Sequence, residues 1–352
     1  MDSMDLPGLH LTSMGDALEE PPESVRWVWD GFLPSNGSSL LSSKPKVGKS
    51  TLARCLALSV SRGSPFLGAK TTQGPVVYVS LEDKRAETIL HFRDLGARGT
   101  EPLLLSTETR IEDPARTMKS LVKAVKRTGA ILVVIDTLIR FAPFGDINDY
   151  VQAKQMCLPF WQMCREQRCH VMLVHHCRKK AEGGPTDNQM GSQGIGGGVD
   201  TLIEVRKTKR GRSMWSEQRY GDDVKAMSLE MDKETRWVGT PEDRHKSYVL
   251  QVLSESNVPL DRANLKKLIK SDNRKINEAL MSLVAHDLVV KSGTGKPGDP
   301  FRYMALTLPP PIGGSKTLRQ VIYGTEKQPS QAQKAWLHLV NGVKTPVSAQ
   351  AT

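Results

Sequence analysis

Short apolar runs alternate with longer segments of helical period between Leu40 and Arg206. The apolar runs are LLSS, PVVYVS, PLLLS, ILVVID and HVMLV, and the helical segments that follow the first four are 50–62, 84–96, 115–127 and 148–167. Strands that alternate with helices predict a parallel sheet with helices on both faces. Because ILVVI is apolar at every position, we expect the strands to be buried on both faces. The runs VDTLIEVRK and KAMSLEMDK predict further strands.

A second, smaller unit follows from about Pro241. The segments SYVLQVLSES, RANLKKLIKS and NRKINEALMSLVAHD predict three helices, and LVVKS and FRYMALTL predict a two-stranded ribbon. This order is typical of a winged helix-turn-helix. The third helix would bury Ile276, Leu280, Leu283 and Val284, and it carries Arg274, Lys275 and Asn277 near its start. Since Asp272, Glu278 and other acids offset the bases, the unit could bind either DNA or protein.

The segment SKPKVGKST follows Leu40 and Leu41 and opens a predicted helix. A bound triphosphate needs backbone N–H groups around it, a lysine at its β and γ oxygens, and a hydroxyl on Mg²⁺. Gly48 would allow close backbone approach, Lys49 would supply the charge, and Ser50 would bind the metal. The predicted ATP site comprises Ser43, Lys44, Pro45, Lys46, Val47, Gly48, Lys49, Ser50 and Thr51. The usual pattern begins with Gly, so we expect Ser43 to occupy a turn that glycine fits more easily.

Two carboxylates follow predicted strands. Asp136 ends ILVVID, where an acid at the carboxyl edge of a parallel strand can hold Mg²⁺; the alternative is a helix N-cap. Glu82, in YVSLED, could orient the attacking water as general base. Its neighbour Asp83 could take that role, or either acid could cap the next helix.

His176 follows the strand HVMLV, at a position where a polar side chain can contact the γ-phosphate and report its loss. The alternatives are a structural pair with His175 or a metal site. Cysteines and histidines gather between Cys164 and Cys177, but CxxC and HxxxH spacings are missing, which disfavours zinc.

Five segments occur in a characteristic order: WVWDGFLPSNGSSLLSSKPKVGKSTLA, VVYVSLED, LVVIDTLIRF with GDIND, VMLVHHCRK and GSQGIGGGVDTLIEVRK. Through them, the stretch from about Trp27 to Gly221 resembles RecA-type ATPases, specifically the RepA-like hexameric replicative helicases with an AAA_25-type domain. The resemblance implies that Lys49 and Ser50 bind nucleotide and Mg²⁺, and that Asp136 is the Walker B acid. It also implies that Glu82 is the catalytic carboxylate and His176 the sensor.

The resemblance further implies a ring, such as a hexamer, with nucleotide between subunits and a basic finger from the neighbour. In EVRKTKRGR the family's Lys-x-Arg pattern is offset by one residue. We expect Arg210 to be the finger, with Lys207 beside it; the alternative is a solvated hairpin edge. The glycine-rich loop 180–198 would grip single-stranded nucleic acid in the channel, or it would be disordered without contact.

Composition limits the class of partner. The 352 residues include 49 Lys and Arg against 38 Asp and Glu, for a formal net charge of +11, which favours a polyanionic partner. Aromatic residues are only 5% of the chain, which favours contacts to backbone phosphates over base stacking. Apolar runs are too short for a membrane span, the acidic N-terminus is unlike a secretory signal, and five cysteines fit a reducing compartment. We therefore expect a cytoplasmic protein.

The predicted architecture is α/β, a RecA-like P-loop NTPase with a mostly parallel sheet and a small C-terminal winged helix-turn-helix. The predicted segments are a disordered acidic arm (1–24), the ATPase domain (25–240), the winged helix (241–308) and a flexible tail (309–352). The function expected first is a ring-forming replicative helicase that uses ATP and Mg²⁺ on single-stranded DNA. The alternatives are an ATP-switched, DNA-binding replication initiator or regulator, and a RecA-like recombination or loading ATPase.

Overall fold

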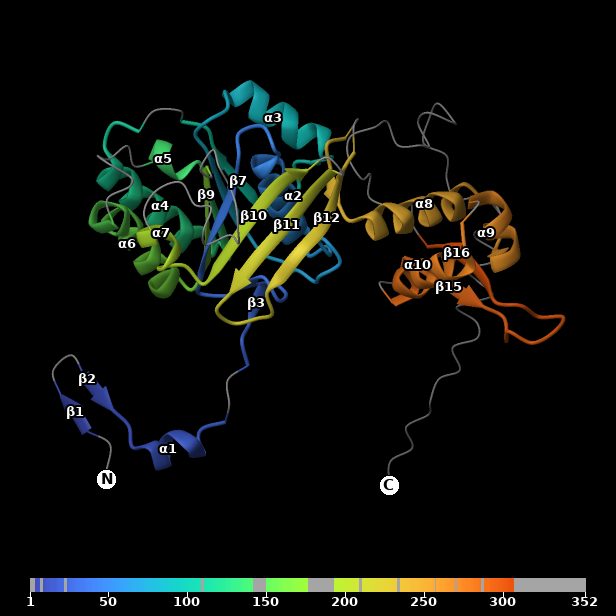
Figure 1. The fold of residues 1–352 in the computed structure, drawn as a ribbon, viewed down its shortest axis with the longest axis horizontal. Helices are drawn as coiled ribbons and strands as arrows, with labels where there is room; N and C mark the ends of the chain where they lie inside the picture. Colours follow the sequence, from blue (N-terminus) through green and yellow to red (C-terminus); the bar gives the residue numbers. More distant parts are fainter. Residues whose placement is uncertain are drawn as a thin grey trace.

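A mostly parallel sheet forms the centre of the structure, a computed structural model (Figure 1). The described residues are 4–6, 9–21, 24–108, 111–141, 150–176, 193–208, 211–232, 235–256, 258–269, 271–285 and 288–306. Within them, nine strands pair in the order β13-β12-β11-β10-β5-β9-β8-β6-β7. The strands from β10 to β7 are parallel, and β11, β12 and β13 extend the sheet in antiparallel fashion.

The apolar runs form the parallel strands that their pattern predicts. These are β5 (Ser38–Ser43), β6 (Val76–Ser80), β7 (Leu103–Ser106), β8 (Leu132–Asp136), β9 (His170–His176) and β10 (Thr201–Thr208). Successive side chains of a strand enter opposite cores: Val134 packs with one cluster, and Val133 and Ile135 pack with the other. Burial on both faces explains why these strands are continuously apolar, and it confirms the α/β fold class.

Helices cover both faces of the sheet. One face packs against α2 (Lys49–Arg62) and α3 (Arg85–Asp94), and the other against α4 (Pro114–Thr128), α5 (Leu138–Phe141), α6 (Tyr150–Gln167) and α7 (Gln193–Gly196). Local sequence signals set the ends of α4: the Asp113 carboxylate accepts a hydrogen bond from the Arg116 N–H, and Gly129 closes the helix at a φ of 64°. The helices begin and end close to where the periodicity predicts.

Three strands of the sheet complete the antiparallel side: β11 (Gly211–Gln218), β12 (Val224–Met231) and β13 (Val238–Gly239). The pattern predicts β12 but not β11, whose sequence GRSMWSEQ mixes polar and apolar residues. A hairpin of β3 (Trp27–Trp29) and β4 (Leu33–Pro34) precedes the sheet. It buries Trp29, which stacks on Phe32 at 4.0 Å and donates its indole N–H to the Phe66 carbonyl.

The segment 1–24, predicted to be a disordered acidic arm, includes three short elements in the structure. The described part contains β1 (Met4–Leu6), β2 (Leu9–Leu11) and α1 (Met14–Glu19), and Figure 1 shows these elements standing away from the sheet. Ser13 stabilises α1 by accepting a hydrogen bond from the Asp16 N–H. Because α1 buries no residue, its helix rests on this local cap.

The C-terminal unit contains the three predicted helices, α8 (Pro241–Glu255), α9 (Arg262–Ile269) and α10 (Asn273–Ala285). The predicted ribbon is β15 (Val289–Ser292) paired with β16 (Arg302–Ala305), and β14 (Leu260–Asp261) adds a strand to it. Ile276, Leu280 and Leu283 are buried in a separate core, as their spacing predicts, whereas Val284 is only partly buried against it. The predicted tail, 309–352, lies outside the described residues. Among the helices that the structure describes, none is long and apolar enough to cross a membrane.

A buried histidine at the start of β9 makes stability depend on pH. The His170 ring lies between the Pro34 carbonyl, at 2.7 Å, and the Ser39 hydroxyl, at 2.9 Å. Burial lowers the pKa of His170 from 6.5 to about 4. Below pH 6.5 the His170 imidazole takes up a proton in the unfolded chain, whereas in the folded chain it does so only near pH 4. The folded state therefore loses stability as the pH falls from 6.5 to about 4.

The unfolding free energy should therefore fall by up to about 3 kcal/mol more in the wild type than in His170→Gln between pH 6.5 and pH 4. Urea denaturation at a series of pH values measures this difference. Parallel curves for the two proteins would contradict the assignment.

Candidate nucleotide-binding site

The carboxyl ends of four neighbouring strands bring the predicted site residues together. In the parallel register, Ser43 of β5 lies opposite His176 of β9, and Asp136 of β8 lies opposite Ser80 of β6. The phosphate loop follows β5, and Glu82 follows β6 by two residues. Residues separated by more than 130 positions in sequence therefore meet at one edge of the sheet, where open α/β sheets bind ligands.

The phosphate loop adopts the conformation that its glycine allows. Gly48 is the N-cap of α2 with a φ of 116°, a backbone conformation that L side chains rarely adopt. A Cβ at Gly48 would also lie 2.9 Å from the Met231 Cε. The expectation that Ser43 occupies a glycine-like turn is wrong: Ser43 is the buried last residue of β5, and Lys46 has the positive φ, 63°. The tight turn lies later in the loop, so a serine fits at its start.

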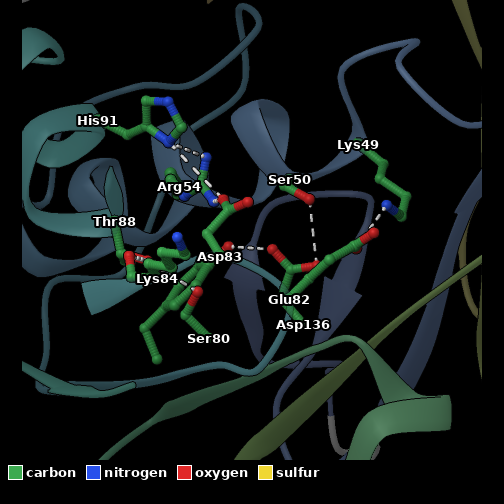
Figure 2. A network of polar contacts seen from close by, with 11 residues as sticks. Lys49, Ser50, Arg54, Ser80, Glu82, Asp83, Lys84, Thr88, His91 and Asp136 are labelled. Atoms are coloured by element: carbon green, nitrogen blue, oxygen red, sulfur yellow. Dashed lines mark hydrogen bonds and ion pairs between the residues drawn. The ribbon is translucent and has the colours of Figure 1, made fainter. Parts of the chain in front are cut away.

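Lys49 and Ser50 each contact one of the two predicted carboxylates (Figure 2). The Lys49 Nζ lies 3.4 Å from the Glu82 Oε2, and the Ser50 Oγ donates to the Asp136 Oδ1 at 3.1 Å. Lys49 is 7% exposed, whereas the Glu82 side chain is 39% exposed. The lysine charge is therefore held at the base of the site by an acid that lies nearer the solvent.

Asp136 is buried among hydroxyl groups. Its Oδ2 accepts a hydrogen bond from the Tyr78 hydroxyl at 2.7 Å, in addition to the bond from Ser50. Burial raises the pKa of Asp136, while Arg54 and the Tyr78 hydrogen bond oppose the rise. Burial also raises the pKa of Tyr78 well above 10, so Tyr78 remains a donor. Both carboxylate oxygens of Asp136 therefore accept hydrogen bonds from side-chain hydroxyls, whereas the carboxylate of a helix N-cap accepts from backbone N–H groups.

Arg54 decides which acid after β6 faces the phosphate loop. It is 3% exposed, and its guanidinium forms an ion pair with Asp83 and lies 3.0 Å from the His91 Nδ1 (Figure 2). Because Asp83 is bound to Arg54, Glu82 is the acid beside Lys49. Burial and then Arg54 lower the pKa of His91. Sequence reasoning missed Arg54, Tyr78 and His91; the detectable signal was an arginine within the apolar helix LARCLALSV.

His176 lies next to the same acid. Its Nε2 is 3.8 Å from the Glu82 Oε1, and burial and then Lys49 lower its pKa, which favours the neutral imidazole. Within the described residues, which do not include Cys177, no group of three or more His, Cys, Asp or Glu could hold a metal ion.

The described basic residues of the segment 204–212 lie on two strands, β10 and β11, and make different contacts. Arg212 donates from its Nε to the Val47 carbonyl of the phosphate loop at 2.7 Å. Arg206 forms an ion pair with Glu204 at 2.7 Å and lies over the Trp215 ring. Lys207 is exposed, and the predicted finger, Arg210, lies outside the described residues, as does most of the predicted channel loop 180–198. The hydrogen bond from Arg212 to the Val47 carbonyl was not predicted.

Comparisons with known proteins identify the family and a similar structure. A family model described as an AAA domain, AAA_25, matches residues 6–182, a span that contains the phosphate loop, Glu82, Asp136 and His176. Among solved structures, the KaiC-like protein PH0186 from the hyperthermophilic archaeon Pyrococcus horikoshii OT3 is similar, with 14% identity and a TM-score of 0.45. The match covers 62% of this chain and 99% of that one. No curated protein matches the sequence.

The hydrogen bond between Tyr78 and Asp136 should stabilise the fold measurably. Tyr78→Phe removes a buried donor to a carboxylate and should lower the unfolding free energy by about 2 kcal/mol. The matched control is Tyr303→Phe, because the Tyr303 hydroxyl has no hydrogen bond within the part of the chain that the structure describes. Chemical denaturation compares the two variants, and equal costs would show that the Tyr78 hydroxyl contributes nothing.

Proposed function

Because the chain belongs to the AAA_25 family of AAA domains and has a RecA-like P-loop fold, we propose that it hydrolyses Mg²⁺-ATP at the carboxyl edge of its sheet. The observation that carries the proposal is the convergence of Lys49, Ser50, Glu82 and Asp136 beside the start of α2. A phosphate loop that opens a helix, a buried lysine, and two acids beside that helix N-terminus suit a Mg²⁺-bound triphosphate and fit few other ligands.

The phosphate loop would bind the nucleotide through residues 43–51. The N-terminus of α2 presents unpaired N–H groups and the positive end of its dipole. Lys49 lies at that end and would contact the β and γ oxygens. Its ion pair with Glu82 would then be exchanged for phosphate oxygens, because the phosphates bring more negative charge to the ammonium group and repel the Glu82 carboxylate.

Ser50 and Asp136 fit a magnesium ion. Their oxygens are 3.1 Å apart, and a hydroxyl with a carboxylate, one directly and one through water, is the donor set that Mg²⁺ accepts beside a triphosphate. Bound there, the ion would neutralise charge on the β and γ phosphates. Tyr78 would hold the Asp136 carboxylate in orientation through its hydrogen bond.

Glu82 would act as the general base. Once released from Lys49, its partly exposed carboxylate could accept a proton from the water that attacks the γ-phosphate. Arg54 would fix the neighbouring Asp83, which limits where Glu82 can reach. His176, 3.8 Å from Glu82 and favoured as neutral imidazole, would donate a hydrogen bond to the γ-phosphate and respond to its loss.

We propose further that the chain is a ring-forming, DNA-dependent motor, with a replicative helicase as the most specific form. The net charge of +11 and the order of the motifs support this proposal. The trans-acting finger remains a prediction for Arg210. Arg212 is a poorer candidate, since it is already bonded to the phosphate loop of its own chain.

A second function, an ATP-switched initiator or regulator, is favoured by one feature. The C-terminal unit has the helix and ribbon order of a winged helix, and Arg274 and Lys275 lie exposed at the start of α10. Arg274 forms an exposed ion pair with Glu278, and this acid reduces the positive charge that the start of α10 would present to DNA. An initiator or regulator of this kind would bind duplex DNA more tightly than single-stranded DNA.

Variants of two site residues test the ATPase proposal. Lys49→Ala should abolish Mg²⁺-ATP binding, whereas Glu82→Gln should bind ATP but lower kcat by about 10²-fold or more. Lys123→Ala, an exposed lysine on α4, is the control and should match the wild type. Phosphate release and nucleotide titration measure the two effects. Wild-type turnover by Glu82→Gln would remove Glu82 from the mechanism.

The motor proposal predicts that single-stranded DNA raises kcat for ATP several-fold and that Mg²⁺-ATP promotes assembly. Phosphate release with single-stranded or duplex DNA, together with mass measurements in solution, tests both effects. Stimulation by duplex alone, with tighter duplex binding, would favour the initiator. A chain that hydrolyses ATP at the same rate with and without DNA would contradict the motor but not the ATPase.

A further inference from the structure

A cavity of about 890 Å³ lies at the edge of the sheet opposite the phosphate loop. Its walls include Gly37 and Ser38 at the start of β5 and Asp200 just before β10. Because β5 and β10 are parallel, their starts lie at the end of the sheet away from residues 43–51. The cavity is therefore separate from the candidate nucleotide site, and the function proposed above does not use it.

The lining of the cavity is strongly basic. Its charged members are Arg26, Arg165, Arg168, Arg219 and Asp200. Asp200 is already neutralised, since its Oδ1 lies 3.2 Å from the Arg219 guanidinium and its Oδ2 accepts from the Ser38 N–H at 2.9 Å. In the described part of the chain, no carboxylate pairs with the other three arginines, all of them exposed. Three positive charges thus share one concave surface without a counter-charge.

Two of these arginines lie at the end of α6, and Arg26 lies just before β3. Arg165 lies in the last turn of α6, and Arg168 follows the helix with a φ of 53°, a conformation that is uncommon for a residue other than glycine. The neighbouring wall is closely packed, because a Cβ at Gly198 would lie 1.9 Å from the Trp161 ring. One wall of the cavity is therefore well packed, and the exposed arginines lie where their side chains are accessible to a ligand.

The chemistry of this lining selects a phosphate-bearing ligand. Arginine presents a planar fork of donors that binds phosphate oxygens in bidentate fashion. The volume, about 890 Å³, exceeds what a single phosphate ion fills, so a ligand with several phosphates suits it better. The lining also includes Trp161 and Tyr220, whose rings could contact a base of a single strand whose phosphates the arginines bind.

We propose that this cavity binds the sugar-phosphate backbone of single-stranded nucleic acid through Arg26, Arg165 and Arg168. The proposal rests on the proposed function only for the identity of the partner, and it does not depend on ATP hydrolysis. A competing occupant would be an acidic peptide, in particular the acidic arm that precedes Ser24 at the rim of the cavity. The test separates the two occupants.

The experiment uses the full chain without nucleotide and a fluorescent oligodeoxythymidylate as probe. In the Arg26→Gln/Arg165→Gln variant, the affinity for the oligonucleotide at low salt should fall about tenfold. The slope of log K against log salt should become less negative by about 1.4, because each phosphate contact to a single strand contributes about 0.7 to that slope. The matched control is Arg116→Gln/Arg127→Gln, two exposed arginines on α4 outside the cavity. The control should retain wild-type affinity and slope.

The outcomes distinguish failure of this proposal from failure of the ATPase. Basal ATP hydrolysis without DNA should be the same in the wild type and both double variants, because none of these arginines lies at the phosphate loop. Equal losses of DNA affinity in the cavity variant and the control would overturn the proposal, as would a wild type that does not bind the oligonucleotide. A synthetic peptide of residues 1–21 tests the competing occupant. If the peptide binds the wild type but not the Arg26→Gln/Arg165→Gln variant, while oligonucleotide binding is the same in both, the cavity belongs to the acidic arm.

Discussion

Four parallel strands end at one edge of the sheet, and their pairing register determines which side chains meet there. Because β5, β9, β8 and β6 are neighbours, the phosphate loop, His176, Asp136 and Glu82 converge beside the N-terminus of α2. A shift of one residue in any strand would turn its terminal side chain to the other face. The apolar side chains that enter both cores fix this register, so packing far from the site sets the site's geometry.

Buried ion pairs and hydrogen bonds then determine which of the residues at this sheet edge face the phosphate loop. Lys49, Arg54 and Asp136 are each less than 10% exposed, and isolated buried charges are costly. Each has a partner: Glu82 for Lys49, Asp83 for Arg54, and the Ser50 and Tyr78 hydroxyls for Asp136. These pairs hold adjacent acids, Glu82 and Asp83, in different roles. One acid faces the exchangeable lysine, and the other anchors the loop to α2.

The sequence pattern predicts the central sheet, its helices and the phosphate loop, because burial on two faces and the loop's spacing leave strong local signals. It does not predict β11, whose mixed polarity reflects a place on the antiparallel side of the sheet, nor the capped helix α1. At the site, sequence alone leaves Glu82 and Asp83 as alternatives, since the choice depends on Arg54, which is 29 residues away from Asp83. The Arg212 contact with Val47 joins residues still farther apart in sequence, 165 positions, and Arg210 lies outside the described residues.

The central claim is that Lys49 exchanges Glu82 for the phosphates of a bound nucleotide. An experimental structure with Mg²⁺ and a non-hydrolysable ATP analogue tests this most directly. The claim predicts phosphate oxygens within hydrogen-bond distance of the Lys49 Nζ, the metal beside Ser50 and Asp136, and a Glu82 carboxylate that has moved away from the lysine. Nucleotide bound elsewhere on the chain, with the Lys49 and Glu82 pair still at its separation of 3.4 Å, would contradict it.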